Sequence, residues 1–553
     1  MKKYNFIIIV TVLFITVSCS KQLDITPPNR IVTEQVMDLL MNGTDAQREN
    51  IFLGMAASLP VFITQPVRNA GVLDPRYYHY SGMAVMRGFE GNDMIFGNNT
   101  AEALPQCFGR EEYRWNSIRN ATGTTNSYWQ HGYDMVAAAN KILAYLPDEV
   151  VGSNANLKKY RAQALFLRAF GYNHLVENFQ DAYTQGGNGK LGVPVYETFN
   201  PAQPYRERET LEKCYQFIVS DLNQAIQDFG EGYFTVDVKN DLDAGVAYFL
   251  RARVAICMGN WAQAASDCQR IIAEYSDNFM TETQYVAQKQ AILVDENNDT
   301  YVDHYFAIRS GFLNMAENPE TIWGFNYTDA SAHSQSTWLN VFATNTQQGG
   351  ARGLNVQIDQ RLYDKIADGD YRKDNFVTEG FRYTYADGIA QNILPYANLK
   401  FASTVGKTVS ASASGADVQT SARTTGNQND WTLFRLSEVY LMLAEAQAQS
   451  NNEAAAKATL DKLIDTRTNG EYNTDTYPSH AGLSTLDRIK LQTRIEMWGE
   501  RGLEFYNNKR WNIAVDRNSS SNHWDKVPIS VKDMTMQIPE LSINLNGLLE
   551  QNP

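Results

Sequence analysis

Aromatic and polar side chains gather in two segments whose composition suits a sugar-binding surface. The first segment runs from Tyr77 to Trp115 and the second from Asp329 to Asn345. Aromatic rings stack on the C–H face of a pyranose, while amide, carboxylate and guanidinium groups bond its hydroxyls. We therefore predict a carbohydrate site with the candidate residues Tyr77, Tyr78, Arg87, Asn92, Asp93, Trp115, Trp338 and Asn340.

Each of these residues has an alternative role in packing or in a turn. The chain holds 9 Trp, 30 Tyr and 25 Phe, so most of its aromatic rings must lie in the core. Trp323 stands in an alternating strand pattern and is expected there. Four further aromatic residues follow a helical period and are interpreted as packing residues: Trp129, Tyr133, Trp498 and Trp511.

Motifs for catalysis are missing from the sequence. It contains no G-x-S-x-G, H-E-x-x-H or Walker pattern. Carboxylate pairs that could hydrolyse a glycoside arise by chance among 62 acidic residues. The sequence therefore predicts a binding protein that is not an enzyme and needs no cofactor.

A short acidic run is a weak calcium candidate. Asp295, Asn297 and Asp299 place oxygen ligands at alternate positions, but Thr300 stands where an EF-hand loop has glycine. A polar turn is the favoured interpretation, and no C-x-x-C pair is present to form a zinc site.

The overall charge excludes one class of partner. With 48 basic and 62 acidic residues the formal net charge is −14, so we expect no nucleic-acid binding. Five cysteines in 553 residues are too few for a disulfide scaffold.

The N-terminus has the pattern of a lipoprotein signal peptide. Two lysines precede an apolar run over 6–17, and Cys19 follows directly after Ser18. We predict a signal peptide over 1–18, a lipid anchor on Cys19 and a polar tether over 19–30. The alternative is an ordinary secreted protein. The sequence leaves open whether the remaining cysteines form a disulfide or stay as thiols: Cys107, Cys214, Cys257 and Cys268.

Helical periodicity then dominates most of the chain. The predicted helices cover 128–146, 157–175, 211–229, 244–275 with a break at Gly259–Asn260, 431–450, 453–466 and 486–508, and a strand is predicted over 320–327. Segment 244–275 resembles one tetratricopeptide repeat. We expect one domain over 31–553, with a helical scaffold over 31–280 and 431–553 and a loop-rich, ligand-facing insertion over 281–430.

Several ordered segments together resemble the SusD/RagB family of outer-membrane nutrient-binding lipoproteins. They are the lipobox at Cys19, the W-x-x-x-Y element from Trp129, FLRA at 166–169, YLMLAEA at 440–446, RIEMWGERGLEFYNNKRW at 494–511, and the closing residues 537–553. The resemblance implies a mainly α fold, in which tetratricopeptide-like helical pairs form a right-handed scaffold with large loop-rich insertions and a few short strands.

The family resemblance also implies a function and a location. It implies oligosaccharide capture at the cell surface and delivery to a TonB-dependent, SusC-like transporter. Some family members bind peptides, so a RagB-like peptide-binding role is the alternative. A helical-repeat adaptor without a small ligand is a third hypothesis, which the Trp- and Tyr-rich loop region disfavours.

Overall fold

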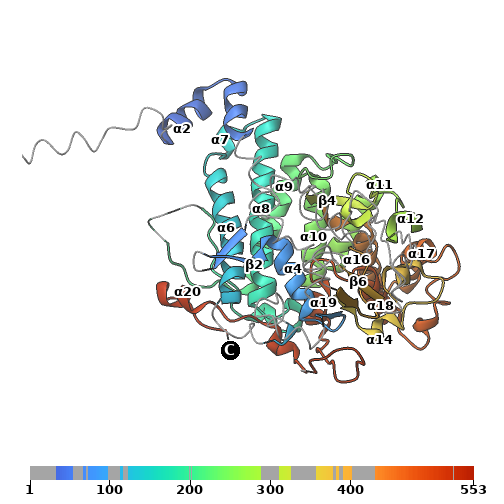
Figure 1. Ribbon diagram of the computed structural model, residues 1–553. Helices are drawn as coiled ribbons and strands as arrows, with labels where there is room; N and C mark the ends of the chain where they lie inside the picture. The colour runs from blue at the N-terminus through green and yellow to red at the C-terminus, as the bar shows by residue number, and fades with distance from the viewer. Residues whose placement is uncertain are drawn as a thin grey trace, which may run out of the picture.

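The computed structural model places most of the chain in one helical body (Figure 1). It describes residues 33–53, 66–69, 72–97, 113–115, 123–198, 200, 202, 204–287, 311–325, 356–377, 381–384, 390–401, 430–526 and 528–552. Cys19, Cys107, the calcium candidates Asp295, Asn297 and Asp299, and the binding candidates Trp338 and Asn340 lie outside the described residues.

Helices make up most of the described structure. They are α2 (Thr33–Asn42), α4 (His79–Phe89), α6 (Gly123–Leu143), α7 (Asp148–Val151), α8 (Ala155–Phe179), α9 (Leu211–Phe229), α10 (Ala244–Met258), α11 (Trp261–Tyr275), α12 (Glu282–Tyr285), α14 (Gln360–Tyr363), α16 (Leu436–Gln449), α17 (Glu453–Arg467), α18 (Thr485–Glu496), α19 (Leu503–Trp511) and α20 (Glu540–Leu545). The mainly α fold class is thus confirmed.

The strands are short and pair two by two. They are β1 (Pro66–Asn69), β2 (Val72–Tyr78), β3 (Met94–Ile95), β4 (Thr321–Phe325), β5 (Gln357–Ile358), β6 (Phe381–Thr384), β7 (Ala390–Ile393) and β8 (Trp431–Arg435). Within the described residues they form the antiparallel pairs β1–β2, β3–β5, β4–β8 and β6–β7.

Two sequence predictions about the C-terminal helices were wrong. Residues 431–435 form strand β8 instead of the first turn of a helix, because they pair with β4 from Thr321↔Arg435 to Phe325↔Trp431. The helix predicted over 486–508 is interrupted between α18 and α19. Arg501 and Gly502 there have φ of 53° and 62°, left-handed values that end a right-handed helix.

The scaffold helices pack in a chain of neighbours. α6 packs on α8, α8 on α9, α9 on α10, and α10 on α11. α11 then packs on α16, which follows it by some 160 residues in sequence, and α16 packs on α17 and α18. Figure 1 shows α6, α8 and α9 side by side, with α16 and α17 toward the opposite side of the molecule. The helices α11 and α16 are therefore neighbours in the fold, although the segment predicted as a loop-rich insertion stands between them in sequence.

The hairpin between α10 and α11 shows how local sequence sets an element boundary. Gly259 has φ of 72° and ends α10, and the Asn260 side chain accepts a hydrogen bond from the Gln263 N–H at the start of α11. Cys257 and Cys268 on these two helices are buried free thiols. Burial raises the pKa of both thiols.

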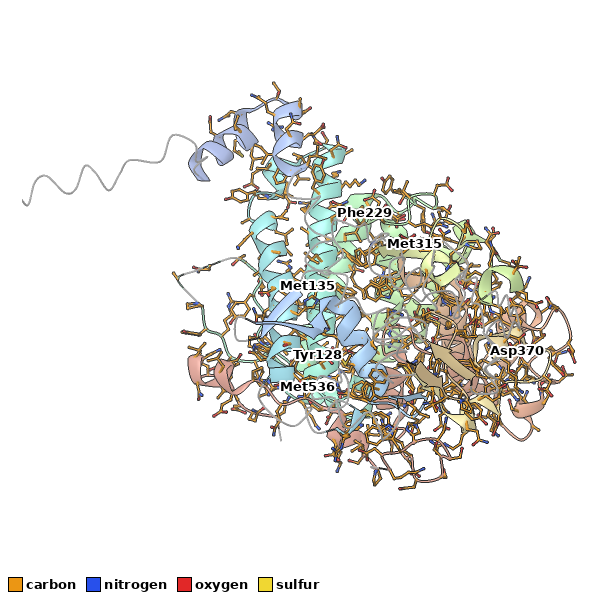
Figure 2. All side chains as sticks on the ribbon, in the orientation of Figure 1. Tyr128, Met135, Phe229, Met315, Asp370 and Met536 are labelled. Atoms are coloured by element: carbon orange, nitrogen blue, oxygen red, sulfur yellow. The ribbon has the colours of Figure 1, made fainter. Side chains whose placement is uncertain are left out.

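A continuous apolar core runs between the helices. Figure 2 shows the side chains that fill the molecule, with Tyr128 and Met135 on α6. Trp323 of β4 is fully buried and meets the rings of Phe166 and Phe434 at centroid distances of 5.4 and 5.3 Å. Its predicted core position is confirmed.

A buried ion network joins the insertion to the scaffold. Arg372 from the insertion, Arg435 at the end of β8 and Arg467 at the end of α17 converge on Glu496, at 3.1, 2.7 and 2.9 Å. Glu320 accepts from Arg435 at 2.7 Å. Burial alone would raise the pKa of Glu496, but the three guanidinium groups outweigh it and lower that pKa well below its usual range.

One short 3-10 helix, η4 (Gly311–Leu313), holds the chain at two distant points. The ring of Phe401 lies 5.6 Å from that of Phe312, and the Asp430 N–H donates to the Leu313 carbonyl at 2.9 Å. Phe401 and Asp430 therefore both lie against η4.

Candidate functional site

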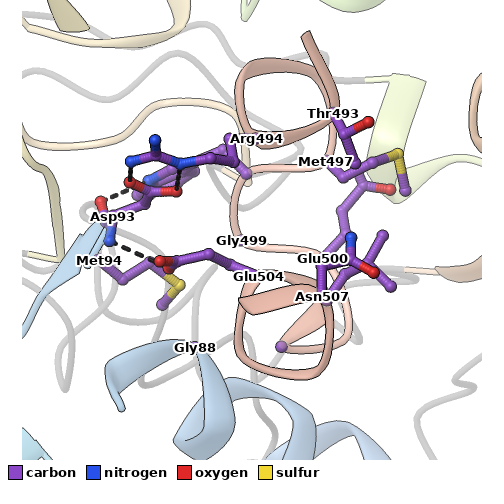
Figure 3. Close-up of a pocket in the computed structure, with 13 residues that line it drawn as sticks. Gly88, Asp93, Met94, Thr493, Arg494, Met497, Gly499, Glu500, Glu504 and Asn507 are labelled. Carbon is purple, nitrogen blue, oxygen red and sulfur yellow. Dashed lines mark hydrogen bonds and ion pairs between the residues drawn. The ribbon is translucent and has the colours of Figure 1, made fainter. Parts of the chain in front are cut away.

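The first predicted binding segment is fixed to the scaffold by an ion pair. Asp93 lies between α4 and β3, and Arg494 of α18 donates to both of its carboxylate oxygens, with an Nε–Oδ2 distance of 2.9 Å (Figure 3). Asp93 is 2% exposed, whereas the Arg494 side chain is 30% exposed. The carboxylate of this pair is therefore buried, whereas the arginine side chain is partly exposed.

Glu504 of α19 holds the same turn through its backbone. Its carboxylate accepts hydrogen bonds from the N–H groups of Asn92 and Asp93 at 2.6 and 3.0 Å. The approach is so close that a Cβ at Gly91 would overlap the Glu504 carboxylate. Burial, reinforced by the charge of Asp93, raises the pKa of Glu504 to about 7.

Asn92 connects the turn to the C-terminal segment. Its side-chain nitrogen donates to the Ala514 carbonyl at 3.3 Å, and its side-chain oxygen accepts from the Asp516 N–H at 2.8 Å. The residue is 8% exposed. Both ends of its amide are therefore engaged within the protein.

Arg87 lies fully inside the protein on α4. Its guanidinium donates to the Asn178 side-chain oxygen at 3.0 and 2.6 Å and pairs with Glu90. The rings of Tyr128 and Phe505 lie on it, with centroids 4.7 and 4.4 Å away. Burial lowers the pKa of this guanidinium, but Glu90 reverses the effect and holds the pKa above its ordinary value.

These contacts show what the three polar candidates do in this structure. Arg87, Asn92 and Asp93 fix the position of the turn that precedes the rest of the predicted binding segment. A direct contact of any of them with a ligand stays a prediction. Sequence reasoning did not single out Arg494 and Glu504, whose only signal was their place in run 494–511, one of the segments that resemble the SusD/RagB family.

Trp115 has an unusual backbone for a large side chain. Its φ is 59°, in the left-handed region, and it is partly buried with its ring 6.0 Å from that of Phe505. A non-glycine residue in this region carries strain, which is typical of side chains whose direction matters. A contact of Trp115 with a ligand stays a prediction.

The other candidates are placed less fully. Tyr77 and Tyr78 lie at the end of β2, where Tyr78 pairs with Pro66 of β1. For these two residues the structure describes the backbone only. Among the described residues, no group of three or more His, Cys, Asp or Glu side chains could hold a metal ion. The described helices also include none long and apolar enough to cross a membrane.

The fold is that of SusD-like binding proteins. A SusD-like carbohydrate binding protein from Bacteroides vulgatus is 19% identical with a TM-score of 0.66, and the match covers 91% of this chain and 97% of that one. A SusD superfamily protein from Bacteroides thetaiotaomicron is 17% identical, with a TM-score of 0.65 and 91% and 99% coverage. A laminarin binding SusD-like protein is 19% identical, with a TM-score of 0.58 and 92% and 98% coverage.

Two protein-family models that match the chain also describe SusD-like proteins. One described as starch-binding associating with outer membrane matches residues 86–256, and the SusD family model matches residues 312–553. No curated protein sequence matches the chain. The chain belongs to the SusD/RagB family.

Proposed function

We propose that this protein binds oligosaccharides at the cell surface and delivers them to a TonB-dependent, SusC-like transporter, without catalysing a reaction. Cys19 carries the lipid that anchors it in the outer membrane after the signal peptide over 1–18 is removed. Membership of a family described as starch-binding and outer-membrane associated supports the proposal. The laminarin-binding relative supports a glycan as ligand.

The observation that carries the proposal is the set of contacts that fix the turn at Asp93 in the first predicted binding segment. Asp93 is held by Arg494, and Glu504 holds the backbone of the same turn, so the segment that leads to Trp115 starts from a fixed position. A strained, partly exposed tryptophan beyond such an anchor suits a preformed stacking surface, which loses little entropy when a sugar binds.

Calorimetric titration tests the choice of ligand. The chain from residue 20 onward is titrated with neutral plant, host and microbial oligosaccharides, with di- and tripeptides as controls. We expect binding to one glycan class that is lost in Trp115→Ala or Trp338→Ala and kept in Trp261→Ala, which removes a partly buried tryptophan of α11. Binding of peptides alone would replace the proposal with a RagB-like peptide-binding role.

Co-purification tests the partner. The full chain, extracted from outer membranes in detergent, should bring a TonB-dependent transporter with it, and Cys19→Ala should release the protein from the membrane fraction. A protein that purifies alone and binds neither sugars nor peptides would favour the adaptor hypothesis.

A further inference from the structure

A cavity on the scaffold, separate from the predicted binding segments, has the features of a second ligand site. It measures about 420 Å³, within the range of about 300–1,000 Å³ that is usual for small-molecule sites. Its walls come from α6, from the described residues between Pro194 and Tyr205, and from the C-terminal stretch that contains α20. Its lining residues include none of those that anchor Asp93.

Aromatic rings form much of the cavity wall. Trp129 and Tyr133 of α6 lie 4.9 Å apart between ring centroids, and Tyr196 lies 5.8 Å from Tyr133. The Tyr133 hydroxyl donates to the Pro194 carbonyl at 2.9 Å, and the Tyr196 hydroxyl donates to the Pro204 carbonyl at 3.0 Å. These bonds hold the rings in place before any ligand arrives.

The sequence interpreted Trp129 and Tyr133 as packing residues, and they do pack. Trp129 is only 7% exposed and also contacts Phe179. Both residues nevertheless line the cavity. Helical periodicity could not show this, because the other wall comes from segments 60 and 410 residues further along the chain.

The polar groups of the cavity divide into two sets. Asn140 donates to the Tyr196 carbonyl and accepts from Arg168, each at 2.8 Å, and both ends of the Asn546 side chain are likewise bonded within the protein. In the part of the chain that the structure describes, the hydroxyls of Thr198 and Ser542 and the amide nitrogen of Asn200 have no protein partner. They are available to a ligand.

The absence of charge among the described lining residues of the cavity restricts the class of ligand that fits it. Among the described residues no Asp, Glu, Lys, Arg or His lines the cavity. A phosphate, a uronic acid or a free peptide terminus would therefore lose its hydration without gaining a counter-charge. Aromatic walls with free hydroxyl and amide groups instead match a neutral ring that has one apolar face and several hydroxyls.

We propose that this cavity is a second binding site, which takes one neutral sugar ring, such as the end residue of an oligosaccharide. The proposal rests on the proposed function for the choice of a glycan as ligand. Tyr205 and Leu545 line the cavity and are 51% and 60% exposed. They mark the side on which the rest of a longer glycan would extend into solvent.

Filling the cavity tests the proposal. Ala137 is an exposed residue of α6 that lines the cavity, so Ala137→Phe should plug it without entering the core. Ala454→Phe makes the same change at an exposed position of α17, outside the cavity lining, and is the matched control. The full chain is purified in detergent, and the probes are glucose and laminaritriose, followed by saturation-transfer NMR and calorimetry.

We expect glucose to receive saturation from the aromatic protons of the wild type and of Ala454→Phe, but not of Ala137→Phe. We also expect Trp338→Ala to leave the glucose signal intact while it weakens laminaritriose binding. A glucose signal that is unchanged in Ala137→Phe, or absent from the wild type, would overturn the cavity site.

The two proposals can fail separately in this experiment. Laminaritriose binding that Trp338→Ala weakens, without any effect of Ala137→Phe, would leave the proposed function standing and remove the second site. In the other case, Ala137→Phe abolishes the glucose signal while Trp338→Ala leaves laminaritriose binding unchanged. That result would keep the cavity site and contradict the predicted loop site. Binding of an apolar peptide in the cavity in place of sugar would make it a protein-docking site and overturn the proposal.

Discussion

Two acidic side chains with different partners meet at the turn that contains Asp93. Asp93 is paired with Arg494, whereas Glu504 has backbone N–H groups as partners and lies close to the charge of Asp93. Burial and that neighbouring charge therefore raise the pKa of Glu504. The anchor of the binding segment is thus sensitive to protonation.

Stability should fall as pH rises across the titration range of Glu504. Its pKa rises from 4.5 to about 7 on folding, so between these values the native chain binds more protons than the unfolded chain. The free energy of unfolding then decreases from pH 4.5 to pH 7 through this residue. Urea unfolding across that range should show a weaker decrease in Glu504→Gln than in the wild type.

Glu453→Gln, at an exposed position at the start of α17, is the control for this prediction and should keep the wild-type dependence. Equal pH dependence in Glu504→Gln and the wild type would contradict the assigned pKa.

The roles of single residues could be predicted only where local pattern decides them. Alternation placed Trp323 in the core correctly. Arg87 has a local partner in Glu90, but the Asn178 side chain that it also contacts stands 91 residues away, and Arg494, the ion-pair partner of Asp93, stands 401 residues away. The local sequence therefore gave no sign that these candidates are buried. A polar side chain in a glycine-rich segment looks the same in sequence whether it faces a ligand or a distant helix.

At the scale of elements, the junction between α18 and α19 packs closely against α4. Gly502 has φ of 62°, and a Cβ there would lie 2.7 Å from the Ala84 carbonyl oxygen and overlap Arg87. The glycine thus lets α19 approach α4 closely enough for Glu504 to reach the turn at Asp93.

Gly502→Ala should therefore destabilise the protein far more than a left-handed backbone alone explains. Gly482 has φ of 75° with nothing within 4 Å of a Cβ, so Gly482→Ala measures the backbone cost, about 1–2 kcal/mol. Gly502→Ala adds overpacking, for a total of roughly 2–5 kcal/mol. Urea unfolding compares the two, and equal losses would show that α4 and α19 separate easily.

Whole elements were easier to predict than their ends. The helix predicted over 211–229 matches α9 within its bounds, because a wide apolar face repeats along it without interruption. The predictions failed at 431–435 and 497–502, where the partner is β4 in one case and α4 in the other. Tertiary contacts override local pattern at both places.

At the scale of the whole molecule, the ion network around Glu496 connects insertion and scaffold. Its three arginines come from parts of the chain between residues 372 and 467, and all of them are at most 1% exposed. Removing one member of such a buried network leaves uncompensated charge inside the protein.

Glu496→Gln should lower the free energy of unfolding by about 3–5 kcal/mol. Glu274→Gln breaks the exposed pair with Arg270 and should cost about 1 kcal/mol or less. Urea unfolding of both variants measures the difference. A small effect of Glu496→Gln would show that this ion network contributes little to the free energy of unfolding.

The anchoring of residues 401 and 430 on η4 has a consequence for how this protein can change over evolution. The ends of segment 402–429 are already held together, so each doubling of its length would cost only about 0.6 kcal/mol in closure entropy. New sequence, or a whole added module, can therefore enter there while the scaffold stays as it is. Chains that share this scaffold can in this way differ in length at this position, with no need to redesign the core.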